Sequence, residues 1–329
     1  MKEYDIRPQE IFAEYLRLSE ADAQAIFDHT QAQTRPCPAC GGAAEEPAFV
    51  KSGFQFVRCP SCRTLFANPL PPASQFERFY RDGQAFRYWA DVFLPRVMAA
   101  RRASIVRPRV DRIAGLCAER GLTPARVLDV GAGHGMFLEE WRARLPATEL
   151  YAVEPNGIMA ALCRKSGFVT LEDIGERAAA LWPEITDLLT CFEVLEHVPD
   201  PLLFLTSLQT MIRPGGFALV TTLGCDGFDI RLLGERANCI CPPGHINFLS
   251  VKGFEAVFRR AGFATVEVST PGELDVDIAL NTLKQSKVNL GGFEQFLLGC
   301  EPDVLADFQR FLVRNRLSSH TWILAQKAE

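Results

Sequence analysis

The stretch Val127-Leu128-Asp129-Val130-Gly131-Ala132-Gly133-His134-Gly135-Met136-Phe137-Leu138 decides the fold of this chain. Its first four residues are apolar around one carboxylate, which is the pattern of a buried strand. Three glycines follow at alternate positions, where the missing Cβ lets the backbone approach a ligand closely. Apolar residues at helical spacing then begin a helix at Met136. A strand, a glycine turn and a helix N-terminus together predict a nucleotide cradle.

The glycine spacing and the next acidic residue indicate which nucleotide is bound. Dinucleotide folds use G-x-G-x-x-G, whereas this turn reads G-x-G-x-G and has Met136 at the place of the third glycine. Glu154 follows the next expected strand, residues 150–153, where its carboxylate would bind both hydroxyls of a ribose. This run resembles the class I S-adenosylmethionine (SAM) methyltransferases. The resemblance implies that SAM is the cofactor and that its methionine half and its ribose contact Asp129, Gly131, Ala132, Gly133, Gly135, Glu154, Pro155, Phe192 and Glu193.

Strand and helix patterns alternate after the cradle. Short apolar stretches predict strands at residues 169–171, 187–192, 217–222, 264–269 and 321–325, with helices between them and a turn at residues 213–216. Parallel strands joined by helices make a doubly wound sheet. The expected fold is therefore α/β, with the seven-stranded sheet of a class I methyltransferase, a small N-terminal zinc ribbon and helical additions. In that family the last two strands are antiparallel neighbours, which makes residues 271–318 a helical insertion.

The chain is expected to divide into four regions: a helical arm at residues 1–35, a zinc ribbon at 36–70, a helical linker or lid at 71–118 and the SAM-binding domain at 119–329. Within the arm, Ser19 and Asp22 have the spacing of a capping box and predict a break between two helices. Aromatic residues between positions 74 and 117 predict a helix pair. Its role as a lid or as core stays open.

Four of the eleven cysteines form a metal-binding pattern. Cys37, Cys40, Cys59 and Cys62 read C-x2-C-x18-C-x2-C, the spacing of a tetrahedral zinc site. A closed shell of four thiolates leaves no open position, so the predicted zinc ion is structural. Redox chemistry is the alternative for a C-x2-C pair. The seven scattered cysteines are expected to be small core residues.

Composition limits the classes of partner. A formal charge of −5 and a pI near 5.7 give no field that attracts polyanions. Five arginines, Arg101, Arg102, Arg107, Arg109 and Arg112, crowd one segment and are expected on a solvated helix face. No apolar run approaches the ~18 residues of a membrane span, and the N-terminus has no signal-peptide pattern. A cytoplasmic protein without membrane contact is expected.

Two further segments carry groups that could do chemistry. The run from Glu193 to Pro201 resembles the segment after strand four in ubiquinone-type O-methyltransferases. In that family the residues matching Glu193, Glu196 and His197 can hold a divalent cation near the substrate, or can shape the loop and the cofactor pocket. Both roles stay open. No [DN]-P-P-[FYW] signature of exocyclic amine methylation is present, which argues against nucleobase targets.

The second segment follows the fifth strand and contains His245 in a proline–glycine loop. The unperturbed pKa of histidine suits a general base. The H-x-N-F-x-S pattern resembles bacterial sugar methyltransferases, including C-methyltransferases with a four-cysteine zinc module, and His245 matches their catalytic histidine. The tyrosine and acidic residue that precede it there are Pro243 and Gly244 here, so oxygen and carbon acceptors both stay open. The alternative is that His245 caps the helix that starts near Ser250.

These patterns predict a SAM-dependent methyltransferase that acts on a small hydroxylated metabolite, a sugar or nucleotide-sugar of polysaccharide or natural-product synthesis. His245 would be the base, with His197 and Glu196 beside the substrate. One alternative is an rRNA or tRNA base methyltransferase that grips RNA with the zinc ribbon, although residues 37–62 hold only Lys51 and Arg58 against Glu45 and Glu46. Another alternative is a non-catalytic SAM-binding scaffold. A homodimer is left open.

Overall fold

The computed structural model describes residues 2–285 and 290–329, which form two compact units. The first, which we call the ribbon unit, comprises Met1–Pro95, Leu223–Phe254 and Val268–Trp322. The second, which we call the sheet unit, comprises Arg96–Thr222, Glu255–Glu267 and Ile323–Glu329. Each unit is therefore assembled from three separate stretches of chain. The four regions expected from the sequence stay a prediction.

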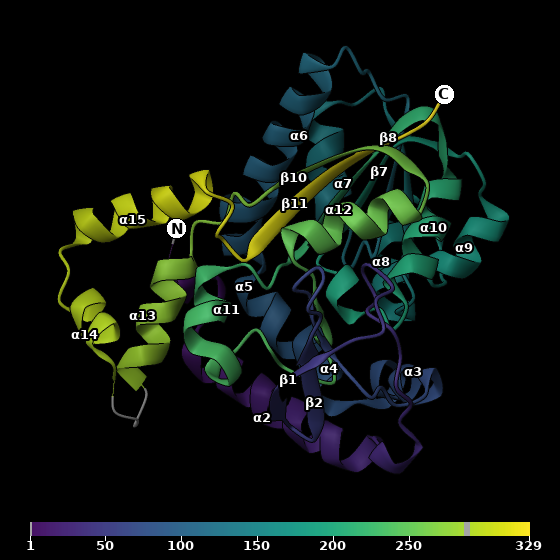
Figure 1. Ribbon diagram of the computed structural model, residues 1–329. Coiled ribbons are helices and arrows are strands. Elements are labelled where there is room, and N and C mark those ends of the chain that lie inside the picture. Colours follow the sequence, from purple (N-terminus) through teal and green to yellow (C-terminus); the bar gives the residue numbers. More distant parts are fainter. Residues whose placement is uncertain (1, 286–289) are drawn as a thin grey trace. The chain divides into compact units, whose positions relative to one another are not determined.

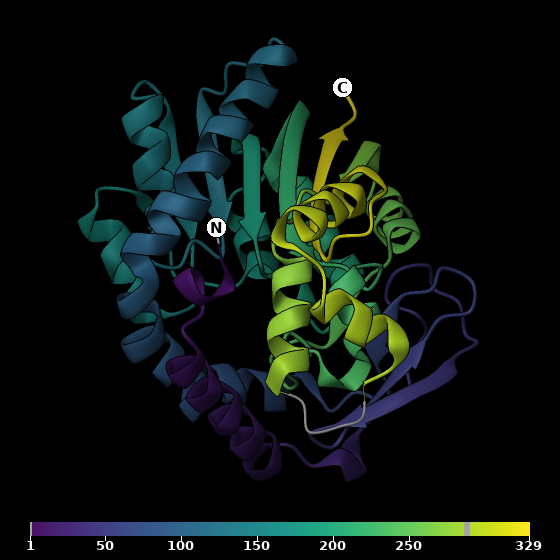
Figure 2. The ribbon, with the colours of Figure 1, turned by 90° about the vertical axis from the view of Figure 1, so that its left-hand side faces the viewer.

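A seven-stranded sheet dominates the sheet unit, with only the ends of three strands assigned to the ribbon unit (Figures 1 and 2). Its spatial order is β10-β11-β8-β7-β4-β5-β6, and the pairings from β8 through to β6 are parallel. The chain winds outward from β4 in one direction and then returns to wind in the other, which is the doubly wound topology. The strands are β4 (Arg126–Val130), β5 (Glu149–Val153), β6 (Val169–Leu171), β7 (Thr186–Phe192), β8 (Ile212–Leu223), β10 (Phe263–Ser269) and β11 (His320–Lys327).

Helices connect these strands as the apolar spacing predicts. The helices are α6 (Arg107–Glu119), α7 (Met136–Arg144), α8 (Gly157–Lys165), α9 (Gly175–Leu181), α10 (Pro201–Met211) and α12 (Val251–Arg260). One boundary differs, because β8 begins at Ile212 and includes the residues expected to form a turn. Thr186 pairs with Ile212 and Leu188 with Phe217, so the extra residues of β8 bulge out of the register. The glycines of this turn thus build a bulge inside a strand.

The ribbon unit has its own small sheet, in the order β1-β2-β3-β9. The strands are β1 (Glu46–Lys51), β2 (Phe54–Arg58), β3 (Leu65–Ala67) and β9 (Asn247–Phe248), and neighbours pair antiparallel. Phe54 and Phe56 are fully buried and belong to the main core of this unit. Leu65 pairs with Phe248, so a short strand from far along the chain completes the sheet.

The predicted break in the N-terminal arm is wrong. After α1 (Glu3–Ile6), α2 runs unbroken from Gln9 to Ile26, through both residues of the expected capping box. The Asp22 carboxylate instead accepts a hydrogen bond of 2.8 Å from the backbone N–H of Ala85. Asp22 therefore satisfies a backbone N–H in the first turn of α4 (Gln84–Tyr88), a different helix. Ser19 is buried within α2.

The segment between the ribbon and the sheet is helical, as expected. It contains α3 (Ala73–Asp82), α4, a π-helical turn (Trp89–Phe93), α5 (Leu94–Arg101) and a second π-helical turn (Arg102–Val106) that leads into α6. Phe76, Phe79 and Phe93 are buried, which supports the core alternative for these three aromatic residues. A lid role for the remaining aromatic residues stays a prediction.

Three helices lie between β10 and β11 in the chain (Figure 1). They are α13 (Asp275–Gln285), α14 (Gly292–Leu298) and α15 (Pro302–Arg314), and they share a small apolar core built on Val276, Leu280, Leu297 and Leu312. The expected insertion at 271–318 includes residues 286–289, which lie outside the described residues. Before this insertion the ribbon unit also contains α11 (Phe228–Leu233). Within the described residues, no helix combines the length and apolar character needed to cross a membrane.

Candidate active site and metal centre

The glycine turn between β4 and α7 has a backbone that side chains would obstruct. Gly131 has φ +76°, and a Cβ at this position would lie 2.5 Å from Cγ2 of Val194. Gly133 has φ +54°, and a Cβ there would meet no atom within 4 Å. The turn therefore needs glycine at Gly131 for space, and at Gly133 for its conformation alone. The open side at Gly133 leaves the backbone accessible to a ligand.

Glu154 is held against this turn. One carboxylate oxygen accepts a hydrogen bond of 2.7 Å from the Gly133 N–H, and the other accepts one of 2.9 Å from the Asn156 N–H. Burial raises the pKa of Glu154, while these two backbone hydrogen bonds oppose the rise. A carboxylate has about four acceptor positions, so each oxygen keeps capacity for a ligand hydroxyl. The geometry suits the expected contact with a ribose.

Asp129 is buried and Arg109 is largely buried at the same end of the sheet. Asp129 on β4 accepts a hydrogen bond of 2.8 Å from the Thr190 hydroxyl, and burial raises its pKa to about 7 against the effects of Thr190 and Arg109. The Arg109 guanidinium lies over the Phe192 ring at 4.4 Å and donates to Glu193 at 3.5 Å. Its Nε is buried and has no hydrogen-bond partner among the described residues. Such a guanidinium can still bind an anionic group.

The expectation of a solvated arginine face on this segment is wrong for Arg109. Its side chain is only 10% exposed. Val106 ends the preceding π-helical turn, Val110 and Ile113 lie on α6 with Arg109, and all three are buried. Arg109 lies three residues after Val106 and four before Ile113, so it is on the same face of the continuous helix. The helical spacing of Arg109 from these apolar residues is thus the sequence signal that could have predicted its burial. Arg102 also forms ion pairs, with Glu139 at 2.6 Å and with Glu140 at 2.9 Å.

The two glutamates in the segment after β7 accept hydrogen bonds from different residues. Glu193 has φ +55° and accepts a hydrogen bond of 2.6 Å from the Thr221 hydroxyl. Glu196 is buried in a short 3-10 turn (Leu195–His197) and accepts one of 2.7 Å from the Thr222 hydroxyl. Within the described chain, no cluster of potential metal ligands includes Glu193. Glu196 and His197 do belong to such a cluster. The divalent-cation alternative therefore stays a prediction.

His245 belongs to the ribbon unit, and its ring is oriented by the backbone. Its Nδ1 lies 2.6 Å from the carbonyl oxygen of Cys239. A carbonyl only accepts hydrogen bonds, so Nδ1 carries the hydrogen and Nε2 is the basic nitrogen of the neutral ring. The alternative role for His245 was to cap the helix that follows it, α12. Ser250 has that role, because its hydroxyl accepts a hydrogen bond of 2.9 Å from the Gly253 N–H.

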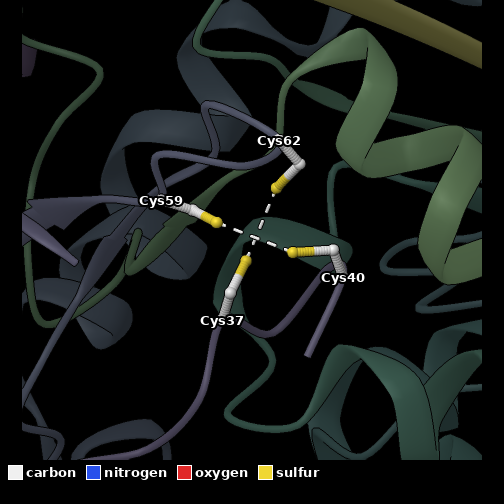
Figure 3. Close-up of side chains that lie close together, drawn as sticks. All are labelled: Cys37, Cys40, Cys59 and Cys62. Carbon is white, nitrogen blue, oxygen red and sulfur yellow. Dashed lines mark hydrogen bonds between the residues drawn. The ribbon is translucent and has the colours of Figure 1, made fainter. Parts of the chain in front are cut away.

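Four cysteines in the ribbon unit point toward a common centre (Figure 3). The sulfur atoms of Cys37 and Cys62 lie 3.6 Å apart, as do those of Cys40 and Cys59, and all four lie within 4.8 Å of one another. Zinc–sulfur bonds of ~2.3 Å in a tetrahedron place sulfur atoms about 3.8 Å apart. No disulfide is formed by these residues. The donor set and its spacing fit one structural zinc ion.

Comparison with known proteins agrees with this architecture. A family model described as a methyltransferase domain matches residues 98–268, just over half of the chain. A ubiquinone biosynthesis O-methyltransferase of Xanthomonas campestris pv. campestris (strain B100) is 36% identical over 173 residues, which are 49% of this chain and 70% of that protein. One of Histophilus somni (strain 2336) is 35% identical over 112 residues, or 31% of this chain. The chain spans 47% of the length of that relative.

A solved structure supports the fold alone. The plantazolicin methyltransferase BamL, in complex with a triazolic desmethylPZN analog and SAH, matches 78% of this chain and 95% of its own, with a TM-score of 0.51 and 12% identity. The family match, the relative covered over more than two thirds of its length and the sheet order agree with one another. The chain therefore belongs to the methyltransferase domain family, and it combines the class I methyltransferase fold with an N-terminal four-cysteine cluster.

Proposed function

We propose that this methyltransferase methylates a small hydroxylated acceptor, a sugar or nucleotide-sugar, with His245 as the general base. The observation that carries the proposal is the hydrogen bond of 2.6 Å between Nδ1 of His245 and the Cys239 carbonyl. It fixes the tautomer in which Nε2 can take a proton, as a base needs. The matched relatives are O-methyltransferases by name, which favours oxygen over carbon as the acceptor atom.

The residues of the sheet unit would hold the cofactor. SAM supplies, when bound, an electrophilic methyl group on a sulfonium centre. The glycine turn and Asp129 would hold its methionine half, and Glu154 would accept hydrogen bonds from the ribose hydroxyls. Arg109 would bind the carboxylate of the methionine half through its unsatisfied Nε. Glu196 and His197, in the turn after β7, would shape the loop beside this site.

His245 would prepare the acceptor. Its Nε2 would remove the hydroxyl proton as the oxygen bonds to the methyl carbon and displaces the sulfur, which would leave with the electron pair of the broken carbon–sulfur bond. The Cys239 carbonyl would stabilise the resulting imidazolium. General base catalysis of this kind contributes roughly 10²–10⁴-fold to a rate. Holding the oxygen close to the methyl carbon supplies much of the remainder, since orientation removes an entropic cost.

Methyl-labelled SAM, purified protein and fractionated cell extract test the proposed substrate class. We expect the label in the small-molecule or nucleotide-sugar fraction, where mass spectrometry would identify the acceptor. The matched control is Gly131→Val, because its side chain would clash with Val194 and disrupt the cradle. Label in RNase-sensitive material would overturn the proposal in favour of the RNA alternative. Absence of transfer to every fraction would overturn it in favour of the scaffold.

Replacing Arg109 by methionine is expected to raise the dissociation constant of SAM about 10- to 100-fold, since a hydrogen bond to a charged group contributes ~1.5–3 kcal/mol. Isothermal titration calorimetry with SAM checks this directly. Arg107→Met on the same helix is the control, because that side chain is 60% exposed and pairs with Glu140. An unchanged affinity in Arg109→Met would remove Arg109 from the cofactor site.

A further inference from the structure

The exposed phenylalanine side chains gather on two consecutive helices of the ribbon unit. Phe293 and Phe296 lie on α14 and Phe311 lies on α15 (Figure 1), and no other phenylalanine among the described residues is exposed. Their exposed fractions run from 47% to 63%, and Val304 on α15 is 51% exposed. Single exposed apolar residues are ordinary, whereas a group of large ones marks an interaction surface.

Ring contacts join these phenylalanines into one surface. Phe293 stacks with Phe296, with 6.5 Å between the ring centroids, and Phe308 stacks with Phe311 at 6.2 Å. Phe228 on α11 connects the two pairs, because its ring meets Phe293 edge-on at 6.5 Å and Phe308 edge-on at 5.0 Å. The rings on α14 and α15 therefore form one continuous surface, which we call the aromatic face: Phe293, Phe296, Phe308 and Phe311.

The small apolar core of the insertion uses other side chains of the same two helices. Leu297 on α14 and Leu312 on α15 are almost completely buried and belong to this core. Among the described residues, Phe296 and Phe311 are not part of it. Each helix thus has one apolar side toward its own core and a second apolar side in solvent. A helix on the surface of a monomer buries one apolar stripe, so the second stripe is available to a partner.

The charges on α15 are sorted along its length. Asp303 and Asp307 lie in the first half of the helix, Arg310 and Arg314 lie in the second half, and all four residues are exposed. Because they are three or four residues apart, they lie along one side of the helix, which we call the charged stripe. This stripe runs beside the aromatic face, since Phe311 directly follows Arg310. A partner with charge of one sign would repel half of the charged stripe.

A second copy of α15 that runs antiparallel matches the charged stripe residue by residue. A two-fold interface joins the same patch of both copies, so each contact occurs twice. With the axis at the middle of the stripe, Asp303 would lie opposite the partner's Arg314. Asp307 would lie opposite the partner's Arg310, because the members of each pair are equidistant from the axis. Within one copy Asp307 and Arg310 form an ion pair at the surface, a contact weak enough to be exchanged.

We propose that the aromatic face and the charged stripe form a two-fold interface through which two copies of this chain associate, with α15 antiparallel to its copy. The partner is a second copy because the charged stripe is complementary to itself. Association would also bury the exposed rings of both copies against each other. The proposal goes beyond the proposed function and does not depend on which acceptor is methylated.

Sedimentation equilibrium on the full chain tests the association. The wild-type protein should form a dimer whose population rises with concentration. Phe311→Ser should raise the dissociation constant of the dimer about 100-fold, because each dimer loses two buried rings. At concentrations where both proteins are monomers their melting temperatures should agree, since Phe311 is exposed in a single copy.

Leu181→Ser is the matched control for Phe311→Ser. Leu181 is 60% exposed on α9, outside the aromatic face and the charged stripe, so its replacement should leave the dissociation constant unchanged. A wild-type protein that stays monomeric throughout the micromolar range would overturn the proposal. So would a dimer that Phe311→Ser does not weaken.

Charge reversal tests the antiparallel arrangement. The double variant Asp303→Arg/Asp307→Arg and the double variant Arg310→Asp/Arg314→Asp each place like charges opposite one another in a homodimer. Each should therefore be a monomer alone, while an equimolar mixture should form a mixed dimer that native mass spectrometry detects. Variants that dimerise alone as the wild type does, or a mixture that forms no dimer, would overturn the antiparallel interface. Circular dichroism checks that both variants keep the fold, which is expected because all four positions are exposed.

Discussion

Replacing Cys59 by serine is expected to abolish zinc binding and to unfold the sheet of the ribbon unit. Cys59 is fully buried, and its sulfur lies 3.6 Å from that of Cys40 in the four-cysteine centre. Structural zinc sites in small peptides contribute roughly 10–16 kcal/mol of binding energy, which is also folding energy. The change should therefore lower the melting temperature by more than Arg109→Met or His245→Ala does. Elemental analysis for zinc and thermal unfolding by circular dichroism measure the two effects.

The loss should extend beyond the cysteines themselves. The Ser250 hydroxyl donates to the carbonyl of Cys62, and β9 pairs with β3, so the loop that holds His245 is tied to the metal centre. Methyl transfer should fall together with zinc content, and a strong zinc chelator should reproduce the effect in the wild type. Cys300→Ser is the control, because Cys300 is half-buried and outside the cluster. A Cys59→Ser protein with wild-type stability and no zinc would contradict a structural role for the metal.

Replacing His245 by alanine is expected to lower kcat about 10²–10⁴-fold, the usual contribution of a general base. The affinity for SAM should not change, because the residues that would hold the cofactor belong to the sheet unit. Initial rates with the acceptor identified by labelling give kcat, and calorimetry gives the affinity for SAM. The combination separates loss of the base from loss of the fold, since unfolding would affect both quantities.

A second histidine provides the control for this experiment. His29 is exposed on a short 3-10 turn (His29–Gln31), and its ring packs edge-on against Phe54. His29→Ala should keep the rate of transfer close to that of the wild type. If His245→Ala also keeps it, another group removes the proton and the base assignment is wrong.

Local patterns predicted the cofactor cradle because each of its parts depends on neighbours in sequence. The strand, the glycine turn and the helix starting at Met136 all lie where the sequence predicts them. The four cysteines are equally local, since two C-x2-C pairs direct their thiolates at one centre whatever surrounds them. The family and the sheet follow from these local features together with the alternation of strands and helices.

Features that depend on distant residues were missed. Asp22 has the sequence context of a helix cap, but its partner is Ala85, 63 residues away. The four residues before Phe217 look like a turn, yet the partner strand β7 draws them into β8 as a bulge. The Nε of Arg7, which is buried with no hydrogen-bond partner among the described residues, is visible only once the chain has folded around it. Propensity and spacing describe a residue's neighbours in the chain, whereas these outcomes are set by contacts made in space.

The division of the ribbon unit into three stretches has a consequence for synthesis on the ribosome. The cysteines emerge early, but Ser250, which bonds to Cys62, follows it by 188 residues, and the unit closes only with the stretch that ends at Trp322. Vectorial translation therefore exposes β3 as an unpaired edge until β9, at Asn247–Phe248, has been made, a state open to aggregation. Binding of zinc by the nascent chain would restrain the edge of β3 until β9 has been synthesised and can pair with it.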